Sequence, residues 1–297
     1  MIEFTKLKLT DKALFNRFTS NYINSEASFA NIMMWKNQYN AEYAVTDDAL
    51  VLKYNNSKGN IAFSMPYTNN CDLILPTLKV LKYCRHNNIE FKVLDGNQAF
   101  VDAICGCDKL NVEYSQIRNY QEYVYLSENL ANLSGKELHS KKNHVNKFKS
   151  LYNYRYVDVD KSIIPMCIKK THQWLQNKYK GDTEAFAGEY VSVKCALDNF
   201  EYFGLIGGAI FVDDNLVAYT IGEKRTEDTA LVHIEKADIN YNGSFAAINY
   251  EFSNVLNKKF KYINREEDMG IDGLRKAKMS YKPAFLTDKY KCIITEV

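Results

Sequence analysis

The same order of predicted elements occurs twice along the 297-residue chain, and this repeat limits the fold more than any other feature. We predict strands where apolar and polar residues alternate, and helices where apolar residues recur every three or four positions. Each half then contains three consecutive strands, a helix, a strand, a second helix and a closing strand. Helical segments precede these strands, at about 11–35 and 163–199. This order predicts two α/β units, each with a mixed, mostly antiparallel sheet flanked by helices.

The hydrophobic pattern sets the expected ranges. Strands are expected at 41–46, 49–54, 61–64, 90–94, near 124, and at 205–212, 216–223, 230–237, 261–264 and 289–295. Helices between them are expected at 73–84, 98–104, 245–256 and 274–281. The chain then divides into a first half at 1–126, a basic helical connection at 127–155 and a second half at 156–297. Because the two halves share no visible sequence identity, one mixed α/β domain without internal symmetry is the alternative.

Charge and hydropathy exclude several classes of protein. Lys and Arg number 38 against 36 Asp and Glu, so no overall positive field draws the chain to nucleic acid or anionic lipid. The longest nearly uncharged apolar run, 203–212, is half of the roughly 20 residues that a membrane helix needs. The first residues lack the apolar core of a signal peptide. Seven scattered cysteines, of which only Cys105 and Cys107 are close, fit reduced thiols in the cytoplasm and give no reason to assign a metal.

Two acid–base candidates lie on the strand expected at 230–237. His233 and Glu235 are two positions apart, so both should point to the same side of the sheet. Transfer of a group to an amine needs a base, because deprotonating an amine of pKa about 10.4 at pH 7 costs about 4.6 kcal/mol. Either residue can accept that proton. A strand histidine bonded to a neighbour is the alternative for His233.

A charged cluster follows the strand expected at 261–264. Residues at strand ends often bind ligands, and an arginine aimed at a developing oxyanion supplies about 3–4 kcal/mol. Arg265 and Arg275 are the candidates for that role. A lined polar pocket is expected to include Glu266, Asp268, Lys276, Lys278 and Tyr281. On the helix at 274–281, a buried stripe of Leu274, Ala277 and Tyr281 is expected. The alternative is a surface ion-pair cluster worth about 0–1 kcal/mol per pair.

A run of basic residues lies on the helix expected between the halves. Lys136, His139, Lys141, Lys142, His144, Lys147 and Lys149 surround one acid, Glu137. This face can contact tRNA phosphates or another polyanion, with Asn143 adding a neutral hydrogen bond. A solvated helix face is the alternative.

Two weaker candidates lie at helix starts. Gly243 and Ser244 open the helix expected at 245–256, where free N–H groups can hold a phosphate. A simple turn is the alternative there. Asn31 lies three positions after Ser28 on an early helix, and either ligand binding or helix capping would explain the pair.

Four segments resemble a largely uncharacterised bacterial family. The segments at 133–148 and 264–283 carry most of the likeness. Those at 25–31 with Trp35, and at 233–237 with Tyr241 and Gly243, add to it. The family is grouped with the C-terminal domain of phosphatidylglycerol lysyltransferases, and the resemblance covers most of the chain. It implies tandem GNAT-like halves, as in the Fem-type peptidoglycan aminoacyltransferases, and transfer of an aminoacyl group from tRNA.

Two departures from these families narrow the expected substrates. Lysyltransferases of this type attach the catalytic part to many membrane helices, which this sequence lacks, so a lipid acceptor is in doubt. GNAT enzymes that use acetyl-CoA carry Gln or Arg, two residues, Gly, one residue, then Gly or Ala. The corresponding stretch here is Asn240-Tyr-Asn-Gly-Ser-Phe245, which differs at the first and last of these positions and weakens acyl-CoA use.

Three functions remain from the sequence. The first is transfer of an acyl or aminoacyl group, from aminoacyl-tRNA or acyl-CoA, to an amine or hydroxyl of a small-molecule acceptor, with tRNA as a partner in the aminoacyl case. The second is a non-catalytic module that binds a small charged metabolite. The third is an acetyl-CoA-dependent N-acetyltransferase. The oligomeric state is left open.

Overall fold

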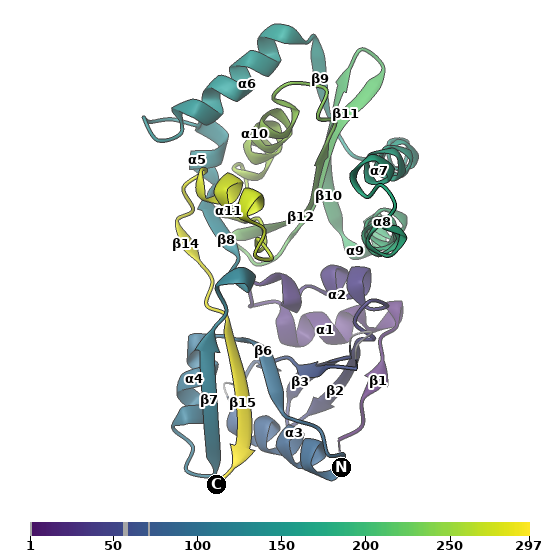
Figure 1. Cartoon of the computed structure of the whole chain (residues 1–297). Coiled ribbons are helices and arrows are strands. Elements are labelled where there is room, and N and C mark those ends of the chain that lie inside the picture. Colours follow the sequence, from purple (N-terminus) through teal and green to yellow (C-terminus); the bar gives the residue numbers. More distant parts are fainter. Residues whose placement is uncertain (1, 56–58, 71) are drawn as a thin grey trace. The chain divides into compact units, whose positions relative to one another are not determined.

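The computed structural model describes residues 2–55, 59–70 and 72–297, which form two compact units (Figure 1). Unit 1 contains the chain up to Gln121 together with the C-terminal segment Thr287–Val297, and unit 2 contains Glu122–Leu286. Each unit is a mixed sheet flanked by helices. The α/β class expected from the sequence is therefore present in both units.

Unit 1 is built on an eight-stranded sheet. Its strands are β1 (Thr5–Lys6), β2 (Glu42–Thr46), β3 (Ala49–Asn55), β4 (Ile61–Phe63), β5 (Tyr67–Thr68), β6 (Lys92–Gly96), β7 (Leu110–Gln116) and β15 (Tyr290–Glu296). Its helices are α1 (Lys12–Thr19), α2 (Phe29–Trp35), α3 (Ile74–His86) and α4 (Gln98–Cys105). The strand order is β1-β2-β3-β4-β6-β15-β7, with β5 on β3, and only β4 and β6 pair in parallel among the described ladders.

Unit 2 is built on a seven-stranded sheet. Its strands are β8 (Tyr123–Leu126), β9 (Tyr154–Asp158), β10 (Leu205–Val212), β11 (Asn215–Lys224), β12 (Thr229–Ala237), β13 (Tyr262–Asn264) and β14 (Phe285–Leu286). Its helices are α5 (Ser127–Asn132), α6 (His139–Leu151), α7 (Ile164–Lys178), α8 (Thr183–Asp198), α9 (Phe200–Phe203), α10 (Ser244–Leu256) and α11 (Asp272–Met279). The order is β9-β10-β11-β12-β13-β8-β14, and β12 and β13 are parallel.

The two sheets share one topology, in which each sheet contains one strand from a distant part of the chain. The last strand, β15, lies between β6 and β7 of unit 1, and β8 lies between β13 and β14 of unit 2. The element order had assigned the strand at 289–295 to the second half and the strand near residue 124 to the first. Hydrogen bonding places each in the other sheet. A local pattern identifies a strand, but it carries no information about which neighbour the strand will pair with.

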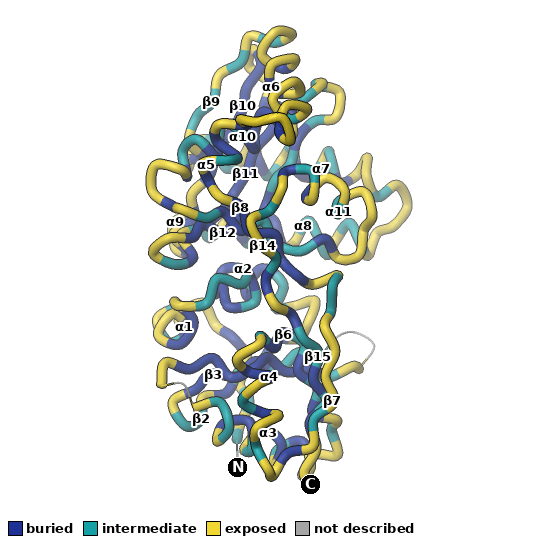
Figure 2. The backbone as a smooth tube through the Cα atoms, turned by 90° about the vertical axis from the view of Figure 1, so that its left-hand side faces the viewer, coloured by how far each residue is buried: buried dark blue, intermediate teal, exposed yellow. Residues whose placement is uncertain are grey.

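Helices cover both faces of the unit 2 sheet. Helices α7 and α8 lie on one face and α10, with α5 and α6, on the other (Figure 1). Trp174 of α7 stacks on Tyr219 of β11 at 6.2 Å between ring centroids. On the opposite face, Ala247 and Ile248 of α10 pack into a buried cluster with Ala218. Figure 2 shows the central strands as buried and the outer side of α6 as exposed.

Strand β12 contains a bulge at His233. Ile221 of β11 lies opposite Ile234, and the next residue, Gly222, lies opposite Val232, so β12 carries one extra residue at this point. Glycine fits there because a Cβ at position 222 would lie 2.4 Å from the Leu231 carbonyl oxygen. A bulge re-aims the side chains that follow it. The bulge therefore sets the direction in which the second half of β12 presents its polar residues.

Most expected elements are present within a few residues of their predicted ends. Strand β10 has the predicted bounds, and α10 begins one residue before its expected start. The short strand β9 was not expected from the sequence, although it pairs with β10 over five residues. Among the described residues, none of the helices combines the length and apolar character needed to cross a membrane.

Candidate functional site

The candidate site lies where β12 and β13 part. These parallel strands pair over only three residues each, from Thr229 opposite Tyr262 to Leu231 opposite Asn264. Arg265 directly follows the last paired residue of β13, and Glu235 lies four residues beyond the last paired residue of β12. The two side chains meet beyond the last paired residues, at the place that we call the β12–β13 opening. Strand ends of this kind are a common location for ligand sites in α/β sheets.

Arg265 and Glu235 form an ion pair in this opening. Arg265 Nη2 lies 2.9 and 3.1 Å from the two carboxylate oxygens of Glu235, and the side chains are 11% and 17% exposed. Burial opposes the charge of Arg265, but Glu235 together with Tyr125 and Tyr281 outweighs this effect, so the pKa of Arg265 is raised. The side-chain amide of Asn249 of α10 lies beside this pair, and its oxygen can accept from Arg265 Nε and Nη1 at 3.3 and 3.2 Å. Glu235, a candidate proton acceptor, and the cation Arg265 are thus in direct contact in a mostly buried environment.

Two tyrosine rings flank the arginine. The Arg265 guanidinium carbon lies 5.7 Å from the ring centroid of Tyr125 and 5.1 Å from that of Tyr281. Both rings are buried, in the core cluster formed beneath α10. Cation–π contacts of this kind favour a charged guanidinium and limit its movement. Tyr281, which the sequence placed in the expected polar pocket, therefore lies beside Arg265.

His233 belongs to a separate buried cluster of charges. Its Nδ1 lies 2.8 Å from Glu266 Oε1 and its Nε2 lies 3.5 Å from Glu223 Oε1, with the ring only 1% exposed. Burial opposes protonation, yet Glu223 and Glu266 raise the pKa of His233 to about 10. An imidazolium at neutral pH has no lone pair with which to accept a proton. Of the two acid–base candidates, Glu235 is therefore the one that this geometry favours.

The charge of His233 should make stability depend on pH. Its pKa is higher in the folded protein than the ordinary value of 6.5, so its charge stabilises the fold fully below pH 6.5. That contribution falls as the pH rises and is lost above a pH of about 10. We expect wild type to exceed His233→Gln in the free energy of unfolding at low pH and the difference to shrink with pH. Urea unfolding across this range measures the difference, and a pH-independent difference would contradict the assignment.

Asp268 and Arg275 form a third pair that holds α11 against the loop after β13. Arg275 Nε and Nη2 donate to the Asp268 carboxylate at 2.8 and 2.9 Å. Asp268 also accepts from the Tyr123 hydroxyl at 2.5 Å and from the Gly270 N–H at 2.8 Å. The bonds from Arg275 come first among the causes that lower the pKa of Asp268. Arg275 therefore fastens α11 to this loop, whereas Arg265 lies beside the candidate base Glu235, which makes Arg265 the better candidate for an oxyanion.

Helix α11 buries a lysine where an apolar stripe was expected. Lys278 is 8% exposed, whereas Ala277 is exposed and Leu274 is half-buried. The Lys278 ammonium donates to the carbonyl oxygens of Arg265 and Glu266 at 2.7 and 3.1 Å, and also to that of Glu267. Burial, followed by the charge of Arg265, lowers the pKa of Lys278. Lys278 therefore positions the backbone beside Arg265, while its neighbour Lys276 points to solvent.

Glu267 has an unusual carboxyl group in the same loop. Burial, with the nearby carboxylates Glu266 and Glu122, raises the pKa of Glu267 to about 7. A carboxyl group with this pKa can exchange a proton at neutral pH. The sequence showed an acidic run but no reason to separate this residue from its neighbours. Its tertiary surroundings make it the competing candidate for the base.

The start of α10 is closed by packing. A Cβ at Gly243 would lie 2.6 Å from the His144 carbonyl oxygen of α6, and Gly243 has φ of +89°. Ser244 is buried and its hydroxyl donates to the Asp238 carbonyl oxygen at 2.9 Å. Its N–H donates to the Tyr241 carbonyl oxygen at 3.0 Å. These contacts show that Gly243 and Ser244 form the start of a helix that packs on α6, and they argue against phosphate binding there.

The remaining expected residues make no recorded contact with Arg265 in the described part of the chain. His139, Lys142 and Asn143 are exposed on α6. Asn31 lies in unit 1, where its Nδ2 donates to the Ser25 carbonyl oxygen at 3.0 Å and its N–H to Ser28 Oγ at 3.1 Å. Helix capping, the alternative considered for this pair, is the arrangement that the hydrogen bonds show.

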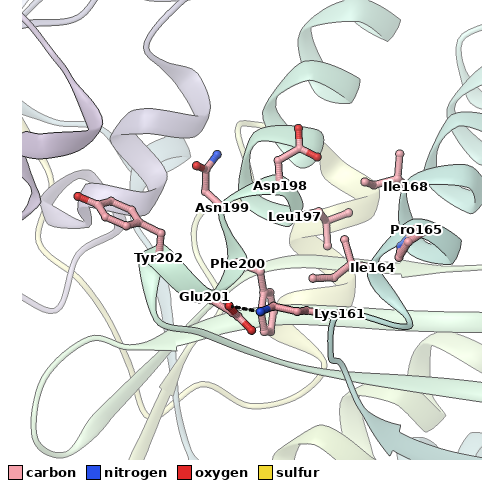
Figure 3. Close-up of a pocket in the computed structure, with 10 residues that line it drawn as sticks. All are labelled: Lys161, Ile164, Pro165, Ile168, Leu197, Asp198, Asn199, Phe200, Glu201 and Tyr202. Carbon is pink, nitrogen blue, oxygen red and sulfur yellow. Dashed lines mark ion pairs between the residues drawn. The ribbon is translucent and has the colours of Figure 1, made fainter.

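A broad concavity of about 630 Å³ lies elsewhere in unit 2 (Figure 3). It is lined by Lys161, Ile164, Pro165, Ile168 and the segment 197–202, around the start of α7 and the end of α8. Lys161 and Glu201 pair across it at 2.9 Å, with both side chains more than half exposed. No residue named as a site candidate from the sequence lines this concavity. Its charged pair is exposed to solvent, whereas Glu235 and Arg265 are mostly buried, so we favour the β12–β13 opening.

The sequence did not identify three residues that the structure brings to Arg265: Tyr125, Asn249 and Lys141. Tyr125 and Asn249 were hidden within a predicted strand and an apolar helix, and Lys141 was one of several lysines. A polar residue on the buried side of a helix was the available signal for Asn249. For Lys141, the signal was its spacing from Val145 and Phe148.

Comparison with known proteins was consistent with this fold. The family model described as "Phosphatidylglycerol lysyltransferase, C-terminal" matches residues 17–293. A conserved protein of unknown function from Bacteroides thetaiotaomicron is 34% identical, with a TM-score of 0.91 over 99% of this chain and 100% of that chain.

Two more distant structures share the fold alone. The C-terminal domain of a protein described as a lysylphosphatidylglycerol synthetase from Agrobacterium fabrum is 10% identical, with a TM-score of 0.65 over 96% of this chain and 92% of that chain. A FemX structure is 8% identical, with a TM-score of 0.64 over 99% and 97%. The expected tandem GNAT-like α/β fold is confirmed.

Proposed function

The chain belongs to the family of the phosphatidylglycerol lysyltransferase C-terminal domain, and on this premise we propose that it is an acyltransferase. It transfers an aminoacyl or acyl group from an activated donor to an amine or hydroxyl of a small-molecule acceptor. We propose aminoacyl-tRNA as the donor and the cytoplasm as the location. The observation that supports this proposal most directly is the Glu235–Arg265 pair in the opening between β12 and β13.

The pair provides the two groups that acyl transfer requires. As the acceptor nitrogen or oxygen attacks the carbonyl carbon of the donor, its proton passes to Glu235 and negative charge develops on the carbonyl oxygen. Protonation removes the charge of Glu235 at the moment when the oxyanion forms. Arg265 can then direct its charge from the carboxylate to the oxyanion. Glu235 returns the proton to the departing oxygen of the donor, which restores the starting pair.

The surface of α6 supports tRNA as the donor. Lys136 and Lys142 are exposed on α6 or just before it, with His139 and Asn143 nearby, and none of these side chains forms an ion pair within the described part of the chain. Lysines in such a position can bind successive phosphates, and this binding weakens as salt is added. The packed start of α10 argues in the same direction, because Gly243 lies against the His144 carbonyl oxygen of α6 and the Ser244 N–H is already bonded to the Tyr241 carbonyl oxygen.

A transfer assay tests the proposal. The full chain is incubated with tRNA carrying a labelled amino acid and with a small-molecule extract of bacterial cells. We expect label to move from tRNA to a product whose mass differs from that of the free amino acid. Labelled acyl-CoA replaces the tRNA in a parallel reaction. Transfer from acyl-CoA alone would instead indicate an N-acetyltransferase, and no transfer from either donor would favour the non-catalytic binding module.

A further inference from the structure

Lys141 differs from the other lysines of α6 because it faces the interior of unit 2. It shares a helix face with Val145 and Phe148, which follow by four and seven positions and are both buried. Lys141 itself is half-buried, whereas Lys142 and Lys147 are exposed. Burial, followed by the nearby charge of Arg265, lowers the pKa of Lys141. One lysine of the basic helix therefore reaches the surroundings of Arg265.

The ring of Tyr281 lies against both cations. Lys141 Nζ is 4.6 Å from the ring centroid, and the Arg265 guanidinium carbon is 5.1 Å from it. The ring is buried and belongs to the core cluster that contains Tyr125. An aromatic face attracts a cation more strongly when water is excluded. Tyr281 can therefore hold two positive charges near one another in spite of their mutual repulsion.

Glu235, the carboxylate beside Arg265, balances only one of these two positive charges. Glu235 pairs with Arg265 through both of its oxygens. Within the part of the chain that the structure describes, the Lys141 ammonium forms no ion pair and no side-chain hydrogen bond. A partly desolvated ammonium without an anion is unfavourable, and an anion bound from solution removes much of that penalty. Among the described residues, Lys141 is therefore the cation of this group that has no counter-charge.

We propose that Lys141, together with Arg265 and the ring of Tyr281, binds an oxyanion of a substrate, either a phosphate ester or a carboxylate. A lysine acts here as a point charge that suits either group. The site would anchor a charged part of the substrate close to Glu235 and leave an uncharged nucleophile or carbonyl at the proton acceptor. The assignment to a substrate rests on the proposed function, whereas anion binding itself can be measured without donor or acceptor.

Thermal unfolding with inorganic phosphate and with acetate tests the site. The experiments use a phosphate-free buffer at constant ionic strength, with wild type, Lys141→Met and the control Lys169→Met. Met retains the apolar stem of lysine, and Lys169 is an exposed lysine on α7. We expect at least one anion to raise Tm of wild type and of Lys169→Met by about 2 °C or more, and Lys141→Met to lose most of the rise. Phosphate acting alone identifies a phosphate ester, and acetate acting alone a carboxylate.

Chemical labelling of the wild-type protein gives an independent measurement, which can be made even if Lys141→Met is unstable. Trinitrobenzenesulfonate reacts with unprotonated amines, and peptide mass spectrometry reads the extent of labelling at Lys141 in the wild-type protein. We expect the active anion to slow labelling at Lys141 several-fold and to leave labelling at Lys169 unchanged. Equal Tm shifts in all three proteins, or no shift with either anion and no protection, would overturn the proposal. Neither result depends on the outcome of the transfer assay.

Discussion

Glu235→Gln is expected to lower the rate of transfer at least about 100-fold, because positioned proton transfer contributes about 10²–10⁴-fold to such reactions. Glutamine retains the shape of the side chain and one acceptor oxygen for Arg265, but it cannot take a proton from the acceptor. Some stability will be lost, since Arg265 would then lack its counter-charge. The rate is therefore measured below the Tm of the variant, and folding is checked by circular dichroism.

Glu267→Gln is the matched control for that experiment. It makes the same chemical change in a neighbouring carboxyl group, one whose pKa is raised to about 7 mainly by burial. We expect this variant to retain most of the activity. A severe loss in Glu267→Gln with a nearly unaffected Glu235→Gln would move the proton acceptor to the loop after β13. Severe loss in both would indicate that protons pass between the two groups.

Asp268→Asn is expected to destabilise the protein by about 2 kcal/mol, in the range found when buried hydrogen-bonding groups lose a partner. Asp268 is fully buried and accepts hydrogen bonds from Arg275, from the Tyr123 hydroxyl and from the Gly270 N–H. An asparagine amide would place N–H groups against some of these donors. It would also remove the charge that holds α11 on the loop carrying Glu266 and Glu267.

Urea unfolding measures this loss, and Lys276→Met is the control because Lys276 is an exposed neighbour on the same helix. The pKa of Asp268 is lowered from its ordinary value of 3.8, first by its bonds from Arg275. Its contribution is therefore present above pH 3.8 and is lost as the pH falls further. The gap between wild type and Asp268→Asn should close in acid. Equal stability of the two proteins at neutral pH would contradict the buried role assigned to this pair.

In the ligand-free protein, the Arg265 and Glu235 side chains are held in place by their bonds to each other. A free carboxylate in this position would repel the proposed anionic substrate, and pairing with Arg265 offsets its charge. In the proposed mechanism the two groups stay paired until the proton of the acceptor reaches Glu235, and Arg265 then turns its charge to the oxyanion. The uncompensated charge of Lys141 then remains as the attraction for an anion. The two proposals thus assign Lys141 to substrate binding and Glu235 to proton transfer.

The local elements of the fold were predictable because hydrophobic periodicity is a local property. The alternating run at 205–212 and the apolar stripe of α10 required no knowledge of their neighbours. Strand β9 was missed because its five residues show weak alternation. The stripe expected on α11 was wrong at Ala277, since the loop carbonyls around Arg265 bury Lys278 in place of an apolar residue.

The charged cluster after β13 was visible in the sequence, but its division into pairs was not. Arg265 bonds Glu235 across 30 positions, and Tyr123 bonds Asp268 across 145. Composition shows which charges are present, while strand pairing and the bulge at His233 decide which of them meet. We expected His233 and Glu235 on one side of the strand. Instead, His233 pairs with Glu266, which helps to raise its pKa, and Glu235 pairs with Arg265.

The sequence by itself determined the repeated element order, the α/β class and the family. These depend on local hydrophobic pattern and on short motifs, both of which can be recognised in a single sequence. The tertiary structure alone decided that β15 completes unit 1 and β8 completes unit 2, since backbone hydrogen bonds are nearly independent of side-chain identity. It also decided which titratable groups are buried together. Their pKa values follow from desolvation and neighbouring charge, which exist only after distant segments have packed.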